Sequence, residues 1–538
     1  MSALHVGLIF LVTLLAAPRW LRVAQREHYE AGRVTAIAAR WLRVVPVNQR
    51  FGAALLGVLA LGVLLVAVGG VAVGGALAVL AVLASAFWPW GLAWRGKEKK
   101  LAFTPRARRL ALAGLSLVLV LDAVALGLAL ASPVWVQALG VLLAGLVALG
   151  SPVVTDAACA LATPVEKRLS AQWVTLAQKR FQEIHPTVVA ITGSYGKTST
   201  KNYAAHLIGP YKATVPSPAS FNNLMGLSKA VNDRLTPGTD VFIAEMGTYG
   251  PGEIAALCEL FPPDVSAITA IGDVHLERMG SRANIVKAKS EILVPARTVV
   301  LNLDSPELRA VADSQVSAGK EVWRVGTGPE ATDVQVRPAS GVETPGTVTV
   351  VVRGEDLGSW PVAPTVHPTN LAVAIALVSS LGVPPAIWLK RIGSIPEVPH
   401  RREVSTSPAG VTVIDDTYNA NPDGALSALE LGLRLADEQR GRLWVVTPGM
   451  IELGDREFEE NQRLGEQVLA RGASLMVVGY TNRAAFEAAV KRVVAEADGG
   501  LGRAEFLPDR PSAVKKVHEQ ARRGDVVLFE NDLPDHYP

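Results

Sequence analysis

Cysteine is nearly absent from this sequence. The 538 residues include only Cys159 and Cys258, which excludes a disulfide framework and a zinc site built from cysteine thiolates. Both are expected to be small buried or membrane-facing residues. Charged residues are also few, at 19% of the chain, whereas 49% of the residues are hydrophobic. These hydrophobic residues are unevenly placed along the chain, so its parts must be considered separately.

Acidic residues are scarce in the first 164 positions. That segment carries 14 Lys/Arg against 5 Asp/Glu, a net charge of +9, and the remainder carries 38 against 44, a net charge of −6, which together give the overall +3. The positive balance therefore describes a basic, apolar segment joined to a mildly acidic remainder. It does not indicate nucleic-acid binding, and we expect no nucleic-acid partner.

Long apolar runs fill the first 164 residues, most of them near the ~20 residues that cross a bilayer. They cover residues 3–18, 52–70, 71–94, 110–132 and 134–152. Positive charge follows the first run instead of preceding it, the reverse of a signal peptide. Placing the basic loops 19–50 and 95–109 in the cytoplasm predicts five spans, an outside N-terminus and a cytoplasmic position for residue 165 onward. We expect a multi-pass protein of the cytoplasmic membrane, with the lipid bilayer as a partner.

One acidic residue, Asp122, lies inside the fourth apolar run. An intramembrane carboxylate is a candidate for a transport or relay role. No basic partner accompanies it in the sequence, so a structural role stays open beside the functional one.

The stretch 188–202 has the pattern of a strand, a glycine-containing turn and a helix. Its β-branched beginning predicts a buried strand, and Gly193-Ser-Tyr-Gly196 turns into Lys197 and Thr198. Such a turn directs backbone N–H groups at a phosphate, while the lysine reaches the outer phosphates and the threonine hydroxyl ligates Mg²⁺. Ile191 stands where the usual P-loop has its first glycine, so an ordinary glycine turn remains the alternative for this stretch alone.

Strand-like runs alternate with helical patterns after this turn, which predicts parallel sheets covered by helices. The first set has strands at 241–244, 265–270 and 299–303, a β excursion at 332–363 and a helix at 370–381. The second set has strands at 411–414, 443–446, 475–478 and 526–529. We expect an α-helical transmembrane region at 1–164, a P-loop parallel-sheet ATPase domain at 165–398 and a C-terminal Rossmann-like α/β domain at 399–538, with a Pro-rich hinge near 396–400.

Two polar motifs follow predicted strands of the first set. Glu245 ends a strand at the edge where doubly wound sheets bind ligands, and there it could hold Mg²⁺ opposite Thr198. His275 follows the next strand, and Lys289 lies in a helical pattern after it. Taken alone, a glutamate at a strand end is more often a helix cap, and a single histidine is more often structural.

Together these stretches resemble the Mur ligase family, the ATP-dependent amide-forming enzymes of peptidoglycan synthesis, and above all its members that add D-alanyl-D-alanine. The resemblance extends from about residue 186 to residue 538. It is carried by Thr192-Gly-Ser-Tyr-Gly-Lys-Thr198, Ser220-Phe-Asn-Asn-Leu-Met-Gly226, Glu245-Met-Gly247 with Pro251-Gly-Glu-Ile254, His275-Leu-Glu277 with Ala288-Lys-Ser-Glu291, His367-Pro-Thr-Asn370, His400-Arg401, Asp415-Asp-Thr-Tyr-Asn-Ala-Asn-Pro422 and Gly449-Met-Ile-Glu-Leu-Gly454.

The resemblance implies a role for each matching position. ATP would be bound by Gly193, Ser194, Gly196, Lys197, Thr198, Ser199, Asn223, Asn370, Arg401 and Asp416. Two Mg²⁺ ions would be held by Thr198, Glu245, His275 and Lys289, the last as a carbamate that supplies an oxygen ligand. The substrate would meet Asn222, Tyr418, Asn419 and Asn421, with Asn222 and Asn223 both matching the family's phosphate-side asparagine. The catalytic residues would be Lys197, His275, Lys289 and Asp416.

The implied reaction uses ATP to convert a muramoyl-peptide carboxylate into an acyl phosphate. The amine of D-alanyl-D-alanine then attacks, and ADP and phosphate are released. Mg²⁺ and Lys197 would spread the charge of the transferred group, and domain closure would exclude water. The implied partners are a muramoyl-peptide precursor, D-alanyl-D-alanine and other proteins of cell-wall synthesis.

One departure from the family concerns the acceptor substrate. Soluble members carry an N-terminal domain for the UDP-linked sugar, and apolar runs take its place here. Either UDP recognition is lost or rebuilt, or the acceptor is a lipid-linked precursor. Three further alternatives are a ligase for another polymer such as a poly-amino acid, a non-catalytic membrane scaffold and a P-loop-driven transporter. For the acidic stretch 530–535 two alternatives remain: it is a solvated tail, or it contacts the site.

Overall fold

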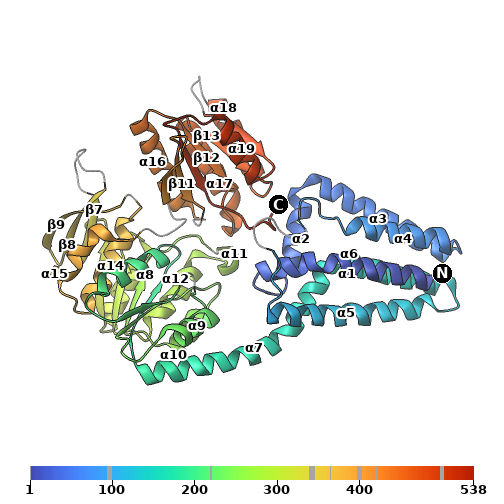
Figure 1. Ribbon diagram of the computed structural model, residues 1–538, viewed down its shortest axis with the longest axis horizontal. Coiled ribbons are helices and arrows are strands. Elements are labelled where there is room, and N and C mark those ends of the chain that lie inside the picture. Colours follow the sequence, from blue (N-terminus) through green and yellow to red (C-terminus); the bar gives the residue numbers. More distant parts are fainter. Residues whose placement is uncertain are drawn as a thin grey trace. The chain divides into compact units, whose positions relative to one another are not determined.

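The computed structural model describes residues 2–93, 100–218, 221–274, 276–338, 346–363, 365–396, 403–417, 421–496 and 502–538. Its contacts divide the chain into two compact units, whose elements are labelled in Figure 1. The helical unit comprises residues 1–169, 479–481 and 533–538. The α/β unit comprises residues 170–478 and 482–532.

Long apolar helices build the helical unit. They are α1 (Ser2–Arg26), α2 (Arg33–Val44), α3 (Pro46–Ala67), α4 (Val71–Ser85), α5 (Pro105–Ala129), α6 (Val134–Leu149) and the first half of α7 (Ser151–Ile184). Helices α1, α3, α4, α5 and α6 pack alongside one another (Figure 1). Each predicted apolar run therefore contains a helix. Helix α7 continues without a break past residue 164, the boundary expected from the sequence, and passes into the α/β unit.

Three of these helices, α1, α3 and α5, are long and apolar enough to cross a membrane, as judged over the described residues. The α6–α7 pair is bent by 74° and makes a fourth candidate, whereas α4 has only 15 residues. The predicted count of five spans stays a prediction. Large apolar side chains such as Leu64 and Leu112 are exposed on the outer faces, which suits contact with lipid.

Asp122 lies on α5 and is buried within the helical unit. Neither of its carboxylate oxygens has a hydrogen-bond partner among the residues that the structure describes. Both cysteines are free and buried, as the sequence predicts.

The α/β unit contains two sheets. The first has the strand order β2-β3-β1-β4-β5-β6-β7-β8-β9, parallel from β2 to β7 and antiparallel from β7 to β9. Its strands are β1 (Thr187–Thr192), β2 (Thr214–Pro216), β3 (Val241–Glu245), β4 (Val265–Ile268), β5 (Thr298–Asn302), β6 (Glu321–Gly326), β7 (Val334–Pro338), β8 (Thr347–Val352) and β9 (Glu355–Pro361). Its helices are α8 (Lys197–Ile208), α9 (Leu224–Arg234), α10 (Glu253–Leu260), α11 (Leu276–Met279), α12 (Arg282–Ser290), α13 (Glu307–Ser317), α14 (Pro368–Ser380) and α15 (Pro385–Trp388). These elements form the first-sheet domain.

The second sheet has the order β10-β11-β15-β12-β13-β14, with only its edge strand β10 antiparallel among the described strands. Its strands are β10 (Glu403–Thr406), β11 (Thr412–Asp416), β12 (Leu443–Thr447), β13 (Ser474–Val478), β14 (Ala504–Leu507) and β15 (Val526–Glu530). Its helices are α16 (Pro422–Gln439), α17 (Glu457–Ala470), α18 (Arg483–Glu496) and α19 (Arg510–Gln520). These elements form the second-sheet domain.

The predicted parallel α/β organisation is confirmed, and each strand predicted from its apolar run is present. The strands β2, β6, β10 and β14 were not predicted from the sequence. Three of them, β2, β10 and β14, are edge strands with partly or fully exposed residues. Such strands lack the continuous apolar run that marks a buried parallel strand.

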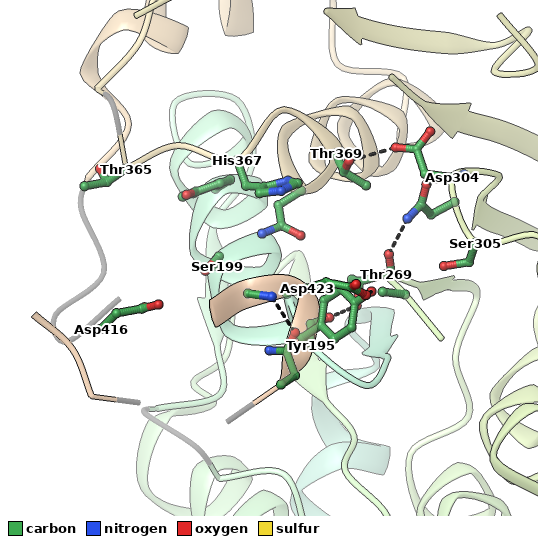
Figure 2. Close-up of a pocket in the computed structure, with 17 residues that line it drawn as sticks. Tyr195, Ser199, Thr269, Asp304, Ser305, Thr365, His367, Thr369, Asp416 and Asp423 are labelled. Carbon is green, nitrogen blue, oxygen red and sulfur yellow. Dashed lines mark hydrogen bonds between the residues drawn. The ribbon is translucent and has the colours of Figure 1, made fainter. Parts of the chain in front are cut away.

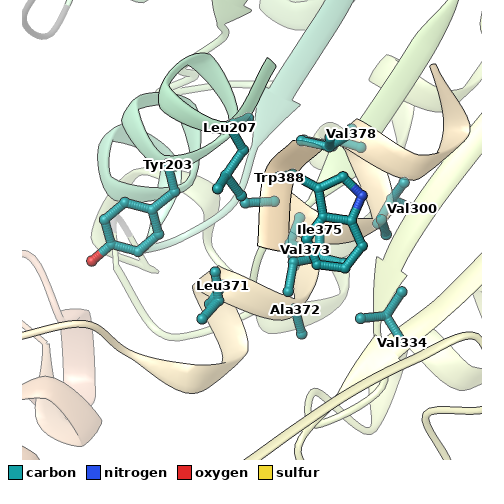
Figure 3. Packing of buried hydrophobic residues seen from close by; sticks show 14 of the residues in the cluster. Tyr203, Leu207, Val300, Val334, Leu371, Ala372, Val373, Ile375, Val378 and Trp388 are labelled. Atoms are coloured by element: carbon teal, nitrogen blue, oxygen red, sulfur yellow. The ribbon is translucent and has the colours of Figure 1, made fainter. Parts of the chain in front are cut away.

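Helix α14 is the centre of the main hydrophobic cluster in the first-sheet domain. Nine of its 13 residues are buried, and α14 packs against α8 and strands β5, β6 and β7. Figure 3 shows part of this cluster, with Leu207 of α8, Val300 of β5 and the fully buried Trp388 beside α14. Because α14 is held from several sides, its first turn is fixed at the edge of the sheet.

Candidate active site

The turn between β1 and α8 requires glycine at two positions. Gly193 has φ +153°, and a Cβ there would lie 2.0 Å from Oγ1 of Thr269. Gly196 has φ +83°, and its Cβ would lie 2.3 Å from Oδ1 of Asn370. Larger residues would disturb both the turn and the first turn of α14. The turn therefore leads the chain closely past α14 into the N-terminus of α8, a geometry that suits a phosphate.

Ser194 ties this turn to the neighbouring loop. Its hydroxyl donates to the carbonyl of Gly272 and accepts from the Gly272 N–H, both at 2.9 Å. Lys197 begins α8, and its Nζ donates to the carbonyl of Gly193 at 2.6 Å. The turn predicted from the sequence is therefore held in place by hydrogen bonds at both ends.

A buried carboxylate lies beside the start of α8. Glu245 ends β3, is 1% exposed and faces Ile191 of β1 in register. Its Oε2 accepts from Oγ1 of Thr198 and from Nζ of Lys201, each at 2.9 Å, and its Oε1 accepts from Nδ2 of Asn222 at 3.2 Å. The structure thus brings together the two residues expected to share one Mg²⁺.

Opposing effects act on the pKa of Glu245. Burial raises it, but the charges of Lys201 and Lys197 and the hydrogen bonds from Lys201 and Thr198 outweigh burial and lower the pKa below its usual value. Lys201 was not among the predicted site residues. Positions 198 and 201 lie three apart on a helix and share one face, a signal that would have identified it.

Lys289 lies on α12 and is 3% exposed. Burial lowers the pKa of its amine well below the usual value, and the charge of Lys197 lowers it further. Both effects favour the neutral amine of Lys289 over its ammonium form. A neutral amine is the form that reacts with CO₂.

A pocket lies at the edge of the first sheet and receives residues from both α/β domains (Figure 2). Oγ1 of Thr369 donates to Oδ2 of Asp304 at 2.8 Å, and the hydroxyl of Tyr195 donates to Oδ2 of Asp423 at 3.0 Å. The lining includes Gly196, Ser199, Thr269, Asn302, Asp304, His367, Asn370, Asp416, Asn421 and Asp423. Four predicted ATP-binding residues, Gly196, Ser199, Asn370 and Asp416, therefore meet at one pocket.

Two buried acids of the second-sheet domain lie on neighbouring strands, and one of them, Asp416, lines this pocket. Asp416 ends β11 and pairs in register with Glu530 at the end of β15. Burial raises the pKa of Glu530 to about 8, and the charge of Asp416 contributes, while the hydrogen bond from Thr447 opposes the shift. Glu530 therefore carries a proton at neutral pH. This residue of the acidic 530–535 stretch lies in the core next to the site.

Residues 277–278 of the first-sheet domain contact Glu452 of the second-sheet domain, and both stretches belong to motifs that resemble the Mur ligase family. The backbone N–H of Glu277 donates to the carbonyl of Glu452 at 3.4 Å, and Nη2 of Arg278 lies 3.5 Å from Oε1 of Glu452. Arg456 also pairs with Asp273. The two α/β domains are therefore linked by ion pairs, none of which the sequence indicated.

The two asparagines of the 220–226 stretch have different surroundings. Asn223 is exposed and caps α9, where its Oδ1 accepts from the N–H of Gly226 at 2.9 Å. Asn222 instead faces Glu245. The assignment of Asn223 to ATP and of Asn222 to the substrate stays a prediction. Asn421 is buried and caps α16 by accepting from the N–H of Gly424 at 2.8 Å.

Four predicted site residues lie outside the described residues, and so does most of the expected hinge. They are His275, Arg401, Tyr418 and Asn419. Their roles stay predictions.

Comparisons with known proteins all identify the same family. Residues 191–378 match the Mur ligase middle domain, and residues 400–530 match the glutamate ligase domain of Mur ligases. The UDP-N-acetylmuramoyl-tripeptide–D-alanyl-D-alanine ligase of Mycobacterium tuberculosis is 34% identical over 364 residues, which are 64% of this chain and 70% of that protein. The Bacillus subtilis enzyme of the same name is 29% identical over 360 residues, 66% of this chain and 75% of its own.

A comparison with solved structures points to the same family. The MurF ligase from Thermotoga maritima in complex with ADP is similar with a TM-score of 0.57 and 26% identity, over 67% of this chain and 80% of that one. Both family matches begin after the helical segment 1–169.

Proposed function

Because this chain belongs to the Mur ligase family and is therefore an ATP-dependent ligase, we propose that it joins D-alanyl-D-alanine to the carboxyl group of a muramoyl-peptide precursor. The observation that carries the proposal is the arrangement around Glu245. A strand-end carboxylate, the Thr198 hydroxyl and a glycine turn are assembled beside a pocket, as phosphoryl transfer from ATP requires.

The nucleotide is proposed to lie between the glycine turn and the first turn of α14. Backbone N–H groups at the start of α8 would receive the phosphates, and Lys197 would exchange its bond to the Gly193 carbonyl for a phosphate oxygen. Asn370, whose side chain lies against Gly196, would contact the adenine. Asp416 and Arg401 would approach from the second-sheet domain.

The residues around Glu245 fit a Mg²⁺ ion. Thr198 and Glu245 present hydroxyl and carboxylate oxygens, the donors that Mg²⁺ prefers. Lys201 and Asn222 hold the two carboxylate oxygens in a fixed orientation. When bound, Mg²⁺ neutralises charge on the phosphates during transfer. His275 is proposed to serve a second ion.

Lys289 is proposed to carry a carbamate. The neutral form of its amine, which burial favours, adds to CO₂, forms one N–C bond and releases one proton. The product supplies two carboxylate-like oxygens, which a hard cation prefers to an amine. The positive charge of Lys197, which already acts on Lys289, would then stabilise the anionic group.

The reaction proceeds through an acyl phosphate. The acceptor carboxylate attacks the γ-phosphorus of ATP and ADP leaves, after which the dipeptide amine attacks the acyl carbon and phosphate leaves. Water would destroy this intermediate, so the site must close. The Tyr195–Asp423 bond and the Arg456–Asp273 pair join the two domains around the site. Tyr418, Asn419 and Asn421 are proposed to face the dipeptide.

The helical unit is proposed to anchor the enzyme in the cytoplasmic membrane, with the α/β unit in the cytoplasm. Support comes from the length of α1, α3 and α5 and their exposed apolar side chains. Because the family matches begin only at residue 191, the acceptor is proposed to be recognised differently from that of soluble relatives. A lipid-linked precursor at the membrane surface fits this arrangement.

Phosphate release from ATP by the full chain in detergent tests the proposal. The UDP-linked muramoyl tripeptide and its lipid-linked equivalent are each supplied with D-alanyl-D-alanine, and Lys197→Ala serves as the control. We expect release that needs both substrates and disappears in the control. ATP binding without release for any acceptor–amine pair would contradict the proposal, and the preferred acceptor would identify how the precursor is recognised.

A further inference from the structure

Residues Leu533–Pro538 belong to the helical unit, although they follow β15 of the second-sheet domain. The loop Gly479–Thr481, which follows β13, belongs to the helical unit as well. A segment of this kind is normally a solvated tail. Here its side chains and its backbone are engaged by residues of the helical unit.

Asp535 makes a buried ion pair. Its Oδ1 lies 2.8 Å from Nη1 of Arg22 on α1, and the two side chains are 5% and 1% exposed. Nη2 of Arg22 donates to the carbonyl of Ala93 at 2.9 Å. The guanidinium is therefore held between the segment and the helical unit.

His536 is also buried and is bound at two points. Its Nε2 lies 2.8 Å from Oε1 of Glu27, and its carbonyl accepts from the indole N–H of Trp41 at 2.8 Å. Glu27 is further held by Nε of Arg33 at 2.9 Å. Burial raises the pKa of Glu27, but His536 and Arg33 outweigh burial and lower it to about 2, so Glu27 is a carboxylate at neutral pH.

The last two residues complete the contact. The guanidinium of Arg40 lies over the ring of Tyr537, 5.3 Å from its centroid. The carbonyl of Pro538 accepts from the N–H groups of Tyr480 and Thr481 at 3.2 and 3.0 Å. The segment and the 479–481 loop therefore hold each other.

A buried ion pair is tolerated only where its geometry and its hydrogen bonds compensate for desolvation. Asp535 has such a counterpart in Arg22, and His536 has a partner for its Nε2 and for its carbonyl, which indicates a specific docking site and not incidental packing. Just before the segment, Asn531 is bound within the α/β unit. Its Nδ2 donates to the carbonyl of Gly449 at 2.6 Å, and its backbone N–H donates to the carbonyl of Asp416 at 3.2 Å.

We propose that Leu533–Pro538, which follow β15 along the chain, form an internal docking segment that binds the helical unit through a site formed by Arg22, Glu27 and Trp41. The chain therefore leaves the helical unit within α7 and returns to it at 479–481 and again at 533–538. The docking does not depend on the substrates proposed above.

Hydrogen exchange of the full chain in detergent, followed by mass spectrometry, tests the proposal. The variants are Arg22→Asp, Asp535→Arg and their combination, which restores an ion pair in reverse. We expect each single variant to accelerate exchange in peptides covering 479–481 and 533–538 on the order of a hundredfold or more. The double variant should return most of the protection. Peptides from β11, β12 and β15 should keep their rates and report that the second-sheet domain is folded.

Two further variants keep the test decisive if a charge reversal impairs folding. Trp41→Phe keeps a buried aromatic ring without reversing any charge and removes the indole N–H that donates to the His536 carbonyl, and we expect faster exchange of the same two peptides. Lys515→Glu, which alters an exposed pair with Glu519, should change nothing there. Fast exchange of 533–538 in the unaltered protein, or a double variant as unprotected as the singles, would overturn the proposal.

Discussion

The ammonium of Lys201 lies 2.9 Å from Oε2 of Glu245, and both side chains are almost completely buried. The same oxygen accepts from Thr198. The carboxylate proposed to hold Mg²⁺ is therefore oriented by a neighbouring cation before any ion is bound. Lys201 acts as a positioning residue for Glu245.

Lys201→Met should destabilise the protein, because it leaves the Glu245 carboxylate buried without its strongest partner. Removal of one member of a buried ion pair costs about 3–5 kcal/mol. Urea unfolding measures the loss. Lys179→Met removes the exposed pair with Glu183 and should cost less than ~1 kcal/mol. A second substitution, Glu245→Gln, should recover part of the stability in the Lys201→Met background, and no recovery would show that the two residues are not coupled.

Gly196→Ala should weaken ATP binding, because its Cβ would meet Oδ1 of Asn370 and its φ is +83°. The backbone strain alone costs about 1–2 kcal/mol, and we expect at least about a tenfold rise in the ATP dissociation constant from displacement of the pocket wall. Gly382→Ala is the matched control, since Gly382 has φ +73° with nothing within 4 Å of its Cβ. It should lose stability and keep its ATP affinity. Equal affinities in both variants would refute the close contact.

Glu530 should make the stability of the protein depend on pH. Its pKa is about 8 in the fold, against a usual value of 4.5, so the native state binds more protons than the unfolded state between these values. The contribution of Glu530 is therefore fully present below about pH 4.5, declines as pH rises and is lost above about pH 8. Urea unfolding from pH 5 to 9 should show a smaller decline in Glu530→Gln than in the unaltered protein. Glu438→Gln, at an exposed position, should leave the decline unchanged.

Lys289 should give a carbamate signal when the protein is supplied with ¹³C-bicarbonate, measured by NMR in the presence of Mg²⁺ and ADP. The signal should be absent in Lys289→Arg, because arginine remains protonated. That variant should also lose activity at least about tenfold, as expected when a ligand environment is disturbed. Persistence of the signal in Lys289→Arg would place the carbamate on another residue, and full activity would exclude a role for the group.

Local patterns were sufficient for the positions of most strands along the chain and for the glycine turn. An apolar run such as 241–244 is long enough to identify a buried parallel strand, and the carboxyl ends of such strands meet at one edge. Glu245 and the turn at 193–196 could therefore be placed together without a structure. The edge strands β2 and β14 were missed because partial exposure removes the apolar pattern.

Side-chain orientation at the site needed the structure. The sequence offered Asn222 and Asn223 as equivalents, and only the N-terminus of α9 decides that Asn223 is a cap while Asn222 faces Glu245. The contact of Glu277 with Glu452 likewise joins motifs from the two α/β domains. Such choices depend on where helices begin and on how domains meet, which neighbouring residues along the chain do not specify.

The sequence by itself determined that an apolar helical region precedes a P-loop α/β region, because apolar runs, strand periodicity and turn residues act over short distances. The resemblance to Mur ligases came from the matched motifs and not from these patterns. Only the tertiary structure decided where residues 533–538 lie. Asp535 meets Arg22 across 513 positions of the chain, and a pair so distant leaves no local pattern. Its formation depends on a buried site whose charges are compensated only after the helical unit has folded.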